Sequence, residues 1–242
     1  MVSRQGFNGI SVTRNFSYVK AVINFALSEF ALEIRNPFVG VYHDRSKGVV
    51  TRKAIPLDDL RRVQRECVQI DDDIRWLVAL VSDTGMRLAE AAGLSVADFY
   101  LQGDVPFVEM PPYPWRSLKT SASARVMPLS GMALWAAQRM LQQAGTSSYA
   151  LPSYNRGSRT SSNSASAAIN NWLKQHVPAG CTMHSFRHSM RDRLRAVQCP
   201  SDIADQIGGW ATDGVGQGYG SGYPIEVLME WVKKMVAASE VG

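Results

Sequence analysis

A helix followed by a glycine-rich segment makes up the stretch Cys181–Pro224, which constrains the fold more than any other part of the chain. His184 and Arg187 stand in an H-x-x-R pattern, and residues three apart share one face of a helix. An imidazole with a tunable proton and a rigid guanidinium can therefore contact the same anion. A phosphate group is the obvious candidate.

Glycine is frequent in the later part of this stretch, with seven glycines from Gly208 to Gly222. A chain this rich in glycine is too permissive to form a regular helix or strand. Trp210 stands at the start of the segment, and Tyr219 and Tyr223 stand near its end. A tyrosine on such a mobile segment is either a positioned nucleophile or a ring that covers an apolar patch.

The length and hydrophobicity of the chain fit an ordinary globular protein. Its 242 residues suffice for one large domain or for a domain with a smaller companion. The hydrophobic fraction of 45% argues against extensive disorder. No apolar run approaches the roughly 20 residues that a membrane helix needs, and the N-terminus lacks the apolar core of a signal peptide. We therefore expect a cytoplasmic protein.

The cysteines and histidines show neither a disulfide pattern nor a ligand pattern. Cys67, Cys181 and Cys199 are widely spaced and odd in number, so we interpret them as reduced thiols. The four histidines form no cluster with cysteine or aspartate at metal-ligand spacing. The sequence predicts no metal site and no cofactor.

Positive charge is concentrated in the middle of the chain, although the net charge of +5 is modest. Residues 105–175 contain seven basic side chains against one acidic side chain, Glu109, which leaves this stretch at +6. Such a surplus fits a surface that faces a polyanion. Scattered solvated side chains without a common function are the alternative interpretation.

The spacing of apolar residues predicts a mainly α-helical fold with a small antiparallel β-sheet (α+β). Residues 96–129 have a β-type composition, and a hairpin there is expected to carry Lys119 at its tip. Residues 153–166 are rich in serine and are predicted to form a polar loop. Helices are predicted over residues 12–34, 57–68, 73–83, 130–145, 167–176, 184–197 and 201–207, with one more from Arg87 and a last one after Pro224.

A domain boundary is expected near residue 48, because residues 39–53 are polar, contain glycine and resemble an exposed linker. This division gives a first part of residues 1–47 and a second part of residues 48–242. The single long helix of the first part cannot bury its apolar stripe by itself. Either it packs on the rest of the chain, or it is the remnant of a larger N-terminal domain.

Six residues in a fixed order resemble the tyrosine recombinase (phage integrase) family. They are Arg87 in TGMRLAEAAGL, Lys119 in LKTSASARVMPL, His184 and Arg187 in HSFRH, Trp210 in GGWA, and Tyr219 nine residues beyond the tryptophan. The resemblance covers about residues 50–240 and implies the fold of the family's catalytic domain. Residues 14–38 are similar to the last helix of the family's core-binding domain and its exit, which implies that this domain is truncated here.

The resemblance implies a site-specific recombinase or integrase that cleaves and rejoins DNA, for integration or excision of a phage or mobile element. Arg87 and Arg187 would bind the non-bridging oxygens of a phosphodiester, with His184 and Trp210 completing the cradle. Trp210 stands where histidine is frequent, and its indole can donate a hydrogen bond but cannot shuttle a proton. Tyr219 would attack the phosphorus and form a covalent 3′-phosphotyrosine.

The resemblance also implies supporting roles for Lys119, His184 and Glu90. Lys119 is the candidate acid for the departing 5′ oxygen, and His184 is a candidate acceptor of the phenolic proton. Glu90 stands one turn after Arg87 and is expected to brace that guanidinium rather than to carry a proton. One ester replaces another in the reaction, so no cofactor is implied.

Double-stranded DNA at recombination sites is the partner that the resemblance implies. Arg116, Arg125, Arg156 and Arg159 are candidate contacts to its phosphates. A homotetramer on DNA, a monomer in free solution and accessory DNA-bending proteins are also implied. Because part of the DNA-contacting surface is expected to be missing, we predict weak and strongly salt-dependent affinity.

Several alternatives stay open from the sequence. Tyr223 is a rival nucleophile, although the spacing from Trp210 matches the family at Tyr219. His188 is interpreted as packed or hydrogen-bonded within its helix rather than catalytic. The whole chain could also be a type IB topoisomerase-like enzyme that relaxes DNA, or a DNA-binding module that has the same fold and no chemistry.

Overall fold

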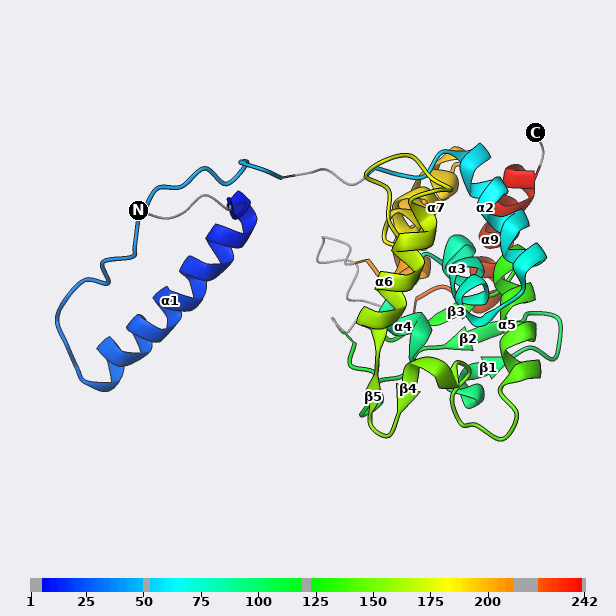
Figure 1. The fold of residues 1–242 in the computed structure, drawn as a ribbon, viewed down its shortest axis with the longest axis horizontal. Helices are drawn as coiled ribbons and strands as arrows, with labels where there is room; N and C mark the ends of the chain where they lie inside the picture. Colours follow the sequence, from blue (N-terminus) through cyan, green and yellow to red (C-terminus); the bar gives the residue numbers. More distant parts are fainter. Residues whose placement is uncertain (1–5, 50–52, 119–122, 211–221, 241–242) are drawn as a thin grey trace. The chain divides into compact units, whose positions relative to one another are not determined.

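The computed structural model describes residues 6–49, 53–118, 123–210 and 222–240. The chain divides into two compact units, Met1–Thr51 and Arg52–Gly242, which are drawn in Figure 1. The assignment of the first unit to a core-binding domain stays a prediction. No described helix has both the length and the apolar character needed to cross a bilayer.

The first unit consists of helix α1 (Gly9–Glu29) and an extended return segment. The side chain of Asn8 caps the helix by accepting from the backbone N–H of Ser11 at 2.8 Å, so α1 begins earlier than the predicted residue 12. It also ends before the predicted residue 34. Within its apolar stripe, Val22 and Phe30 are 69% and 73% accessible, whereas Ile23, Ala26 and Leu27 are only partly exposed.

The second unit is built around α3 (Asp73–Thr84), which packs against α2 (Leu57–Ile70), α5 (Gly131–Gln143) and α7 (Ser185–Ala196) (Figure 1). Asp72 caps α3 through the backbone N–H of Arg75. Most of α3 is buried, as its apolar composition predicts. This central helix ends just before the segment that carries Arg87. The packing of α3 in the core therefore fixes the backbone position of Arg87.

A small antiparallel sheet lies in the same unit, in the order β1 (Phe99–Tyr100), β2 (Phe107–Glu109) and β3 (Val126–Pro128). Val108 of β2 faces Met127 of β3, and both are fully buried. The predicted mainly helical fold with a small antiparallel sheet is confirmed. The connection between β2 and β3 includes Lys119, which lies outside the described residues together with residues 120–122.

The serine-rich stretch 153–166 is more regular than the predicted loop. It forms a two-stranded hairpin, β4 (Asn155–Arg156) with β5 (Arg159–Thr160), and then the start of α6 (Ser162–Leu173). Serine is a mediocre helix former, but Ala165, Ile169 and Leu173 recur every four residues and are fully buried. The packing of this stripe outweighs the local preference of the serines.

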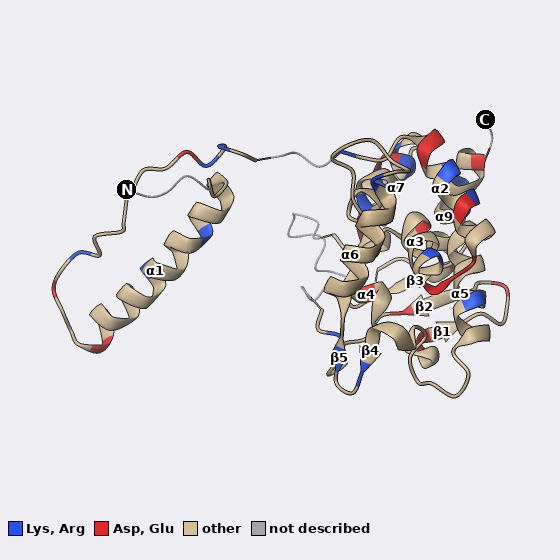
Figure 2. Ribbon diagram, in the orientation of Figure 1, with Lys and Arg blue, Asp and Glu red and all other residues tan. Residues whose placement is uncertain are grey.

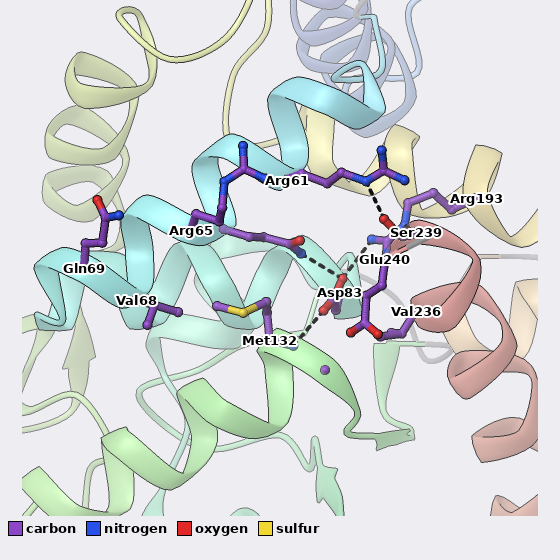
Figure 3. Close-up of a pocket in the computed structure, with 12 residues that line it drawn as sticks. Arg61, Arg65, Val68, Gln69, Asp83, Met132, Arg193, Val236, Ser239 and Glu240 are labelled. Carbon is purple, nitrogen blue, oxygen red and sulfur yellow. Dashed lines mark hydrogen bonds and ion pairs between the residues drawn. The ribbon is translucent and has the colours of Figure 1, made fainter. Parts of the chain in front are cut away.

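The last helix, α9 (Ile225–Glu240), buries its apolar stripe in the same unit, next to α7 and β3. Figure 3 shows how its end is held. Arg193 donates through Nε to the hydroxyl of Ser239 at 2.7 Å, and its Nη1 lies 2.8 Å from the carboxylate of Asp83. Arg61 donates to the backbone oxygen of Ser239. These side chains border a hollow of about 530 Å³, and Arg87 and Arg187 do not line it.

Candidate active site

Arg87 is held at the start of α4 (Leu88–Ala92) by the carboxylate of Glu90. Glu90 accepts the Nη1 of Arg87 at 2.6 Å on one oxygen and the backbone N–H of Arg87 at 3.0 Å on the other. Arg87 also donates to the hydroxyl of Ser123 at 2.8 Å. Its side chain remains 25% exposed, whereas Glu90 is 3% exposed. The predicted brace between Glu90 and Arg87 is therefore present.

Arg187 lies on α7 and is almost fully buried, with 5% of the residue accessible. Its Nη1 donates to the backbone oxygen of Gly85 at 2.8 Å, two residues before Arg87. Its Nη2 donates to the backbone oxygen of Gly209 at 3.3 Å, one residue before Trp210. Carbonyl groups from two separate segments thus fix the guanidinium, and they bring Arg187 next to both of those sequence-predicted residues.

Trp210 follows α8 (Ser201–Gly208), and its ring contacts two guanidinium groups. The Arg187 guanidinium carbon is 4.6 Å from the centre of the Trp210 ring, and that of Arg191 is 4.7 Å from it. Arg191 in turn donates to the carboxylate of Asp205 at 2.7 Å. A Cβ atom at Gly208 would overlap the indole ring, so glycine is required for the ring to take this place.

The positions of Arg125 and Arg187 leave the site rich in positive charge. Burial and then the charges of Arg87 and Arg125 lower the pKa of Arg187 to about 10. Burial acts to raise the pKa of Glu90, but Arg125 and the hydrogen bonds from Arg87 outweigh it and hold this pKa below its ordinary value. Arg87 and Arg125 therefore share one carboxylate with Arg187 nearby, and an anion bound among the three guanidinium groups would relieve their repulsion.

His184 is the residue that precedes the first turn of α7, and it is exposed. Its backbone oxygen accepts the N–H of Arg187 at 3.2 Å. The ring of His188 lies 5.4 Å from the ring of His184, edge to face. His188 is exposed, so it is not packed in the core, and its interpretation as a non-catalytic residue stays a prediction.

Of the two candidate nucleophiles, Tyr219 lies outside the described residues, as does the segment 211–221 around it. Tyr223 is described. Its hydroxyl donates to the carboxylate of Asp202, a hydrogen bond that raises the pKa of the phenol. The side chain of Gln206 bonds both the backbone N–H and the backbone oxygen of Tyr223, at 2.8 and 3.0 Å. Tyr223 is therefore attached to α8, with its hydroxyl occupied.

The four arginines named as candidate DNA contacts occupy different environments. Arg116 must be corrected, because its side chain is fully buried and its Nη1 lies 3.0 Å from Asp98. Arg156 and Arg159 of the β4–β5 hairpin are exposed. Figure 2 shows the blue of basic residues on this hairpin. Arg125 is buried beside Glu90. Only the hairpin pair is placed as a contact to a DNA backbone requires.

The described residues contain no group of three histidine, cysteine, aspartate or glutamate side chains arranged to hold a metal ion. The polar chemistry of the site is instead that of arginine, indole and imidazole donors. Such donors suit the oxygen atoms of an anion.

Comparison with known proteins identifies the family. The sequence profile of the phage integrase family matches residues 57–221. The chain belongs to the phage integrase family. This membership confirms the resemblance drawn from the sequence, and with it the expectation of a tyrosine-type site-specific recombinase. A search of curated proteins finds no significant match to the chain.

Solved structures of recombinases and integrases share the fold of this chain. The Tn1549 transposon integrase, in complex with transposon right end DNA, has a TM-score of 0.65 at 16% identity, covering 98% of this chain and 80% of that chain. The integrase from mycobacterium phage Brujita has a TM-score of 0.55 at 14% identity, covering 95% and 73%. XerH recombinase bound to difH substrate has a TM-score of 0.54 at 12% identity, covering 97% and 70%.

The sequence marked Arg125 only as a candidate DNA contact and did not single out Arg191, although both arginines lie at the site. Arg191 stands four residues after Arg187, so a shared helix face could have indicated it. Arg125 carries no such signal, because its partners Glu90 and Ile207 are far from it in the sequence. Only the tertiary fold brings these three residues together.

Proposed function

We propose that this protein cleaves and rejoins DNA strands through a 3′-phosphotyrosine formed by Tyr219. The observation that carries the proposal is the convergence of Arg87 and Arg187 around a surplus of positive charge, with both guanidinium groups held by carbonyl, hydroxyl or carboxylate oxygens. A phosphodiester is anionic and resists attack, so groups fixed in advance to receive its charge lower the barrier directly.

The scissile phosphate is placed between the two arginines. Arg87 and Arg187 bind its non-bridging oxygens, and the indole N–H of Trp210 and the imidazole of His184 add further donors. Because Arg87 is the more exposed of the two arginines, it meets the incoming strand first. The indole ring of Trp210 also contacts the Arg187 guanidinium and helps to keep it in place.

The chemistry is a pair of ester exchanges. The Tyr219 oxygen forms a bond to phosphorus as the bond from phosphorus to the 5′ oxygen breaks, and His184 accepts the phenolic proton. Lys119 gives a proton to the departing 5′ oxygen. Attack of a 5′ hydroxyl from another strand then reverses the exchange and releases Tyr219. The ester bond energy is retained throughout, so the reaction requires no nucleotide cofactor.

Tyr219, not Tyr223, is assigned as the nucleophile. The spacing of nine residues from Trp210 supports this choice. The environment of Tyr223 supports it as well, since its hydroxyl is engaged by Asp202 and its backbone by Gln206. A phenol whose pKa is raised by a carboxylate neighbour is poorly suited to become a phenolate.

Double-stranded DNA is the proposed partner. The Tn1549 integrase and XerH were each solved with DNA. In this chain, Arg156 and Arg159 on the exposed β4–β5 hairpin are proposed contacts to the backbone phosphates. A homotetramer on two recombination sites, assisted by DNA-bending proteins, is the proposed assembly. Integration or excision of a phage or mobile element is the proposed outcome.

A nicked suicide duplex tests the assignment. It traps the covalent intermediate because the short strand beyond the cleavage point diffuses away. The unaltered protein should form a protein–DNA adduct that survives denaturation. Tyr219→Phe should form none, and the matched variant Tyr223→Phe should form it normally. An adduct lost in Tyr223→Phe and kept in Tyr219→Phe would reverse the assignment, and no adduct on any duplex would favour a DNA-binding module.

A further inference from the structure

Arg125 is the least expected member of the site. It directly precedes β3, in the stretch that the sequence analysis assigned to the DNA-facing surface. Its side chain is instead 5% exposed, and the Glu90 side chain beside it is 3% exposed. A guanidinium buried to this degree cannot be explained as a contact to solvent or to the outside of a duplex. It has to be explained by what it touches.

The guanidinium of Arg125 contacts three segments that are far apart in the sequence. Its Nη2 and Nη1 lie 3.4 and 3.5 Å from Oε2 of Glu90, the oxygen that also accepts the backbone N–H of Arg87. Nη1 donates to the backbone oxygen of Ser123 at 3.0 Å, within the connection that leads to β3. Nε donates to the backbone oxygen of Ile207 at 3.0 Å, in the last turn of α8. Arg125 therefore links α4, β3 and α8.

The contact to Glu90 changes the charge that Arg87 presents. Glu90 gives one oxygen to the side chain of Arg87 and the other to the backbone of Arg87, so by itself it would cancel the charge of this arginine. Arg125 shares the second oxygen and supplies a compensating positive charge. With Arg187 included, three positive charges and one negative charge leave a surplus of two. Without Arg125 the surplus falls to one.

The contacts of Arg125 to Ser123 and Ile207 help to position the two catalytic guanidinium groups. The hydroxyl of Ser123 accepts from Arg87, so a bond to its backbone oxygen steadies a residue that orients the catalytic guanidinium. Ile207 precedes Gly208 and Gly209, and the backbone oxygen of Gly209 accepts from Arg187. Arg125 thus fixes the backbone on both sides of the proposed phosphate position. It does so without being directed at that position itself.

We propose that Arg125 is a positioning residue for strand cleavage, which balances the charge of Glu90 and ties α4 to the end of α8 so that Arg87 and Arg187 face one phosphate. This inference rests on the proposed function. It makes Arg125 part of the rate of the chemical step and not part of the affinity for DNA. A backbone contact would have the opposite signature, with weaker binding and an unchanged rate once DNA is saturating.

The test measures single-turnover adduct formation at saturating DNA, on a nicked duplex that carries the site where the unaltered protein forms its adduct. Arg125→Gln should lower this rate by about tenfold to a hundredfold, and the Kd for the same duplex should change less than about twofold. Arg125→Lys keeps the charge and should recover part of the rate. Arg139→Gln is the control and should match the unaltered rate. Arg139 is a partly exposed arginine of α5, and it is paired with Asp71 at the end of α2.

Two further measurements separate positioning from simple loss of structure. In a Glu90→Gln background, replacing Arg125 by Gln should lower the rate less, because the charge that Arg125 balances is already gone. A methylphosphonate at the cleavage point removes a non-bridging charge and should also shrink the deficit of Arg125→Gln. Thermal unfolding reports whether each variant is folded, and if Arg125→Gln does not fold, Arg125→Lys takes its place in every comparison.

An unaltered rate in folded Arg125→Gln would overturn the inference. So would a rate loss that is matched by the loss in DNA affinity, or that is the same with and without the carboxylate of Glu90. Failure of the proposed function gives a different result, because the unaltered protein itself would then form no adduct.

Discussion

Two arginines on the same helix, six residues apart, illustrate two uses of a buried guanidinium. Arg193 of α7 faces the end of α9 and is paired with the carboxylate of Asp83, which also accepts from Gln64 and the backbone of Met132. Arg187 of the same helix bonds backbone oxygens, and its charged neighbours include Arg87 and Arg125. The first cluster is balanced in charge, and the second is not.

The difference indicates which cluster serves the fold and which serves the reaction. A balanced buried pair is costly to break, because removing one partner leaves an uncompensated charge. A surplus of like charge is costly to keep, and a folded protein maintains it only where surrounding contacts hold it in place. The surplus of positive charge around Arg187 therefore supports the proposal that this cluster binds an anion from outside.

The largest effect on stability is expected at the balanced cluster. Arg193→Met should lower the free energy of unfolding by about 3–5 kcal/mol, because Asp83 would remain buried without its cation. Urea unfolding measures the change. The double variant Arg193→Met, Asp83→Leu should recover part of the loss, and a double variant no more stable than the single one would argue against a balanced pair.

The largest effect on the reaction is expected at the unbalanced cluster. Arg187→Gln should slow adduct formation by about 10²–10³-fold or more, because a fixed donor to the phosphate is lost. Its unfolding free energy should fall by less than that of Arg193→Met, since repulsion with Arg87 and Arg125 is also relieved. Adduct trapping and urea unfolding together give both numbers. Equal destabilisation of the two variants would remove the distinction between the clusters.

A smaller effect separates buried arginines from exposed ones. Replacing Arg156 and Arg159 by Gln should reduce the slope of log K against log salt by about 2, or roughly 0.9 per phosphate contact, and leave stability unchanged. Arg116→Met should leave the salt slope unchanged and lower the free energy of unfolding, because Arg116 is buried against Asp98. Filter binding at several salt concentrations measures the slope. A lower slope in folded Arg116→Met would restore that residue as a DNA contact.

The smallest effect is a dependence on pH at Glu90. The pKa of Glu90 in the folded protein lies below its ordinary value of 4.5, so its stabilising contribution is complete above that value and is lost as the pH falls through the lowered one. The difference in unfolding free energy between the unaltered protein and Glu90→Gln should therefore narrow in acid below pH 4.5. A constant difference across that range would show that the carboxylate is not held by Arg87 and Arg125.

The sequence was sufficient for the mainly helical fold with its small sheet, because local spacing marks these elements, and a resemblance to a family was sufficient to propose the catalytic side chains. Apolar periodicity predicted α3 and α9, and the H-x-x-R pattern predicted the helix α7, which carries Arg187 and begins directly after His184. The sequence was not sufficient for the roles of arginines. Arg116 and Arg125 both look like surface charge in a basic stretch, and only contacts to distant residues show that they are internal.

Gly85 contributes both to the fold, as the end of α3, and to the proposed active site, as a partner of Arg187. It ends α3 in a left-handed conformation, with φ of 58°, where an added Cβ would overlap the sulfur of Met190. Its carbonyl also receives the Nη1 of Arg187. In a mutational scan that selects for recombination, this position without a side chain should therefore be as intolerant as the arginines around it, since any replacement disturbs helix termination and guanidinium placement at once.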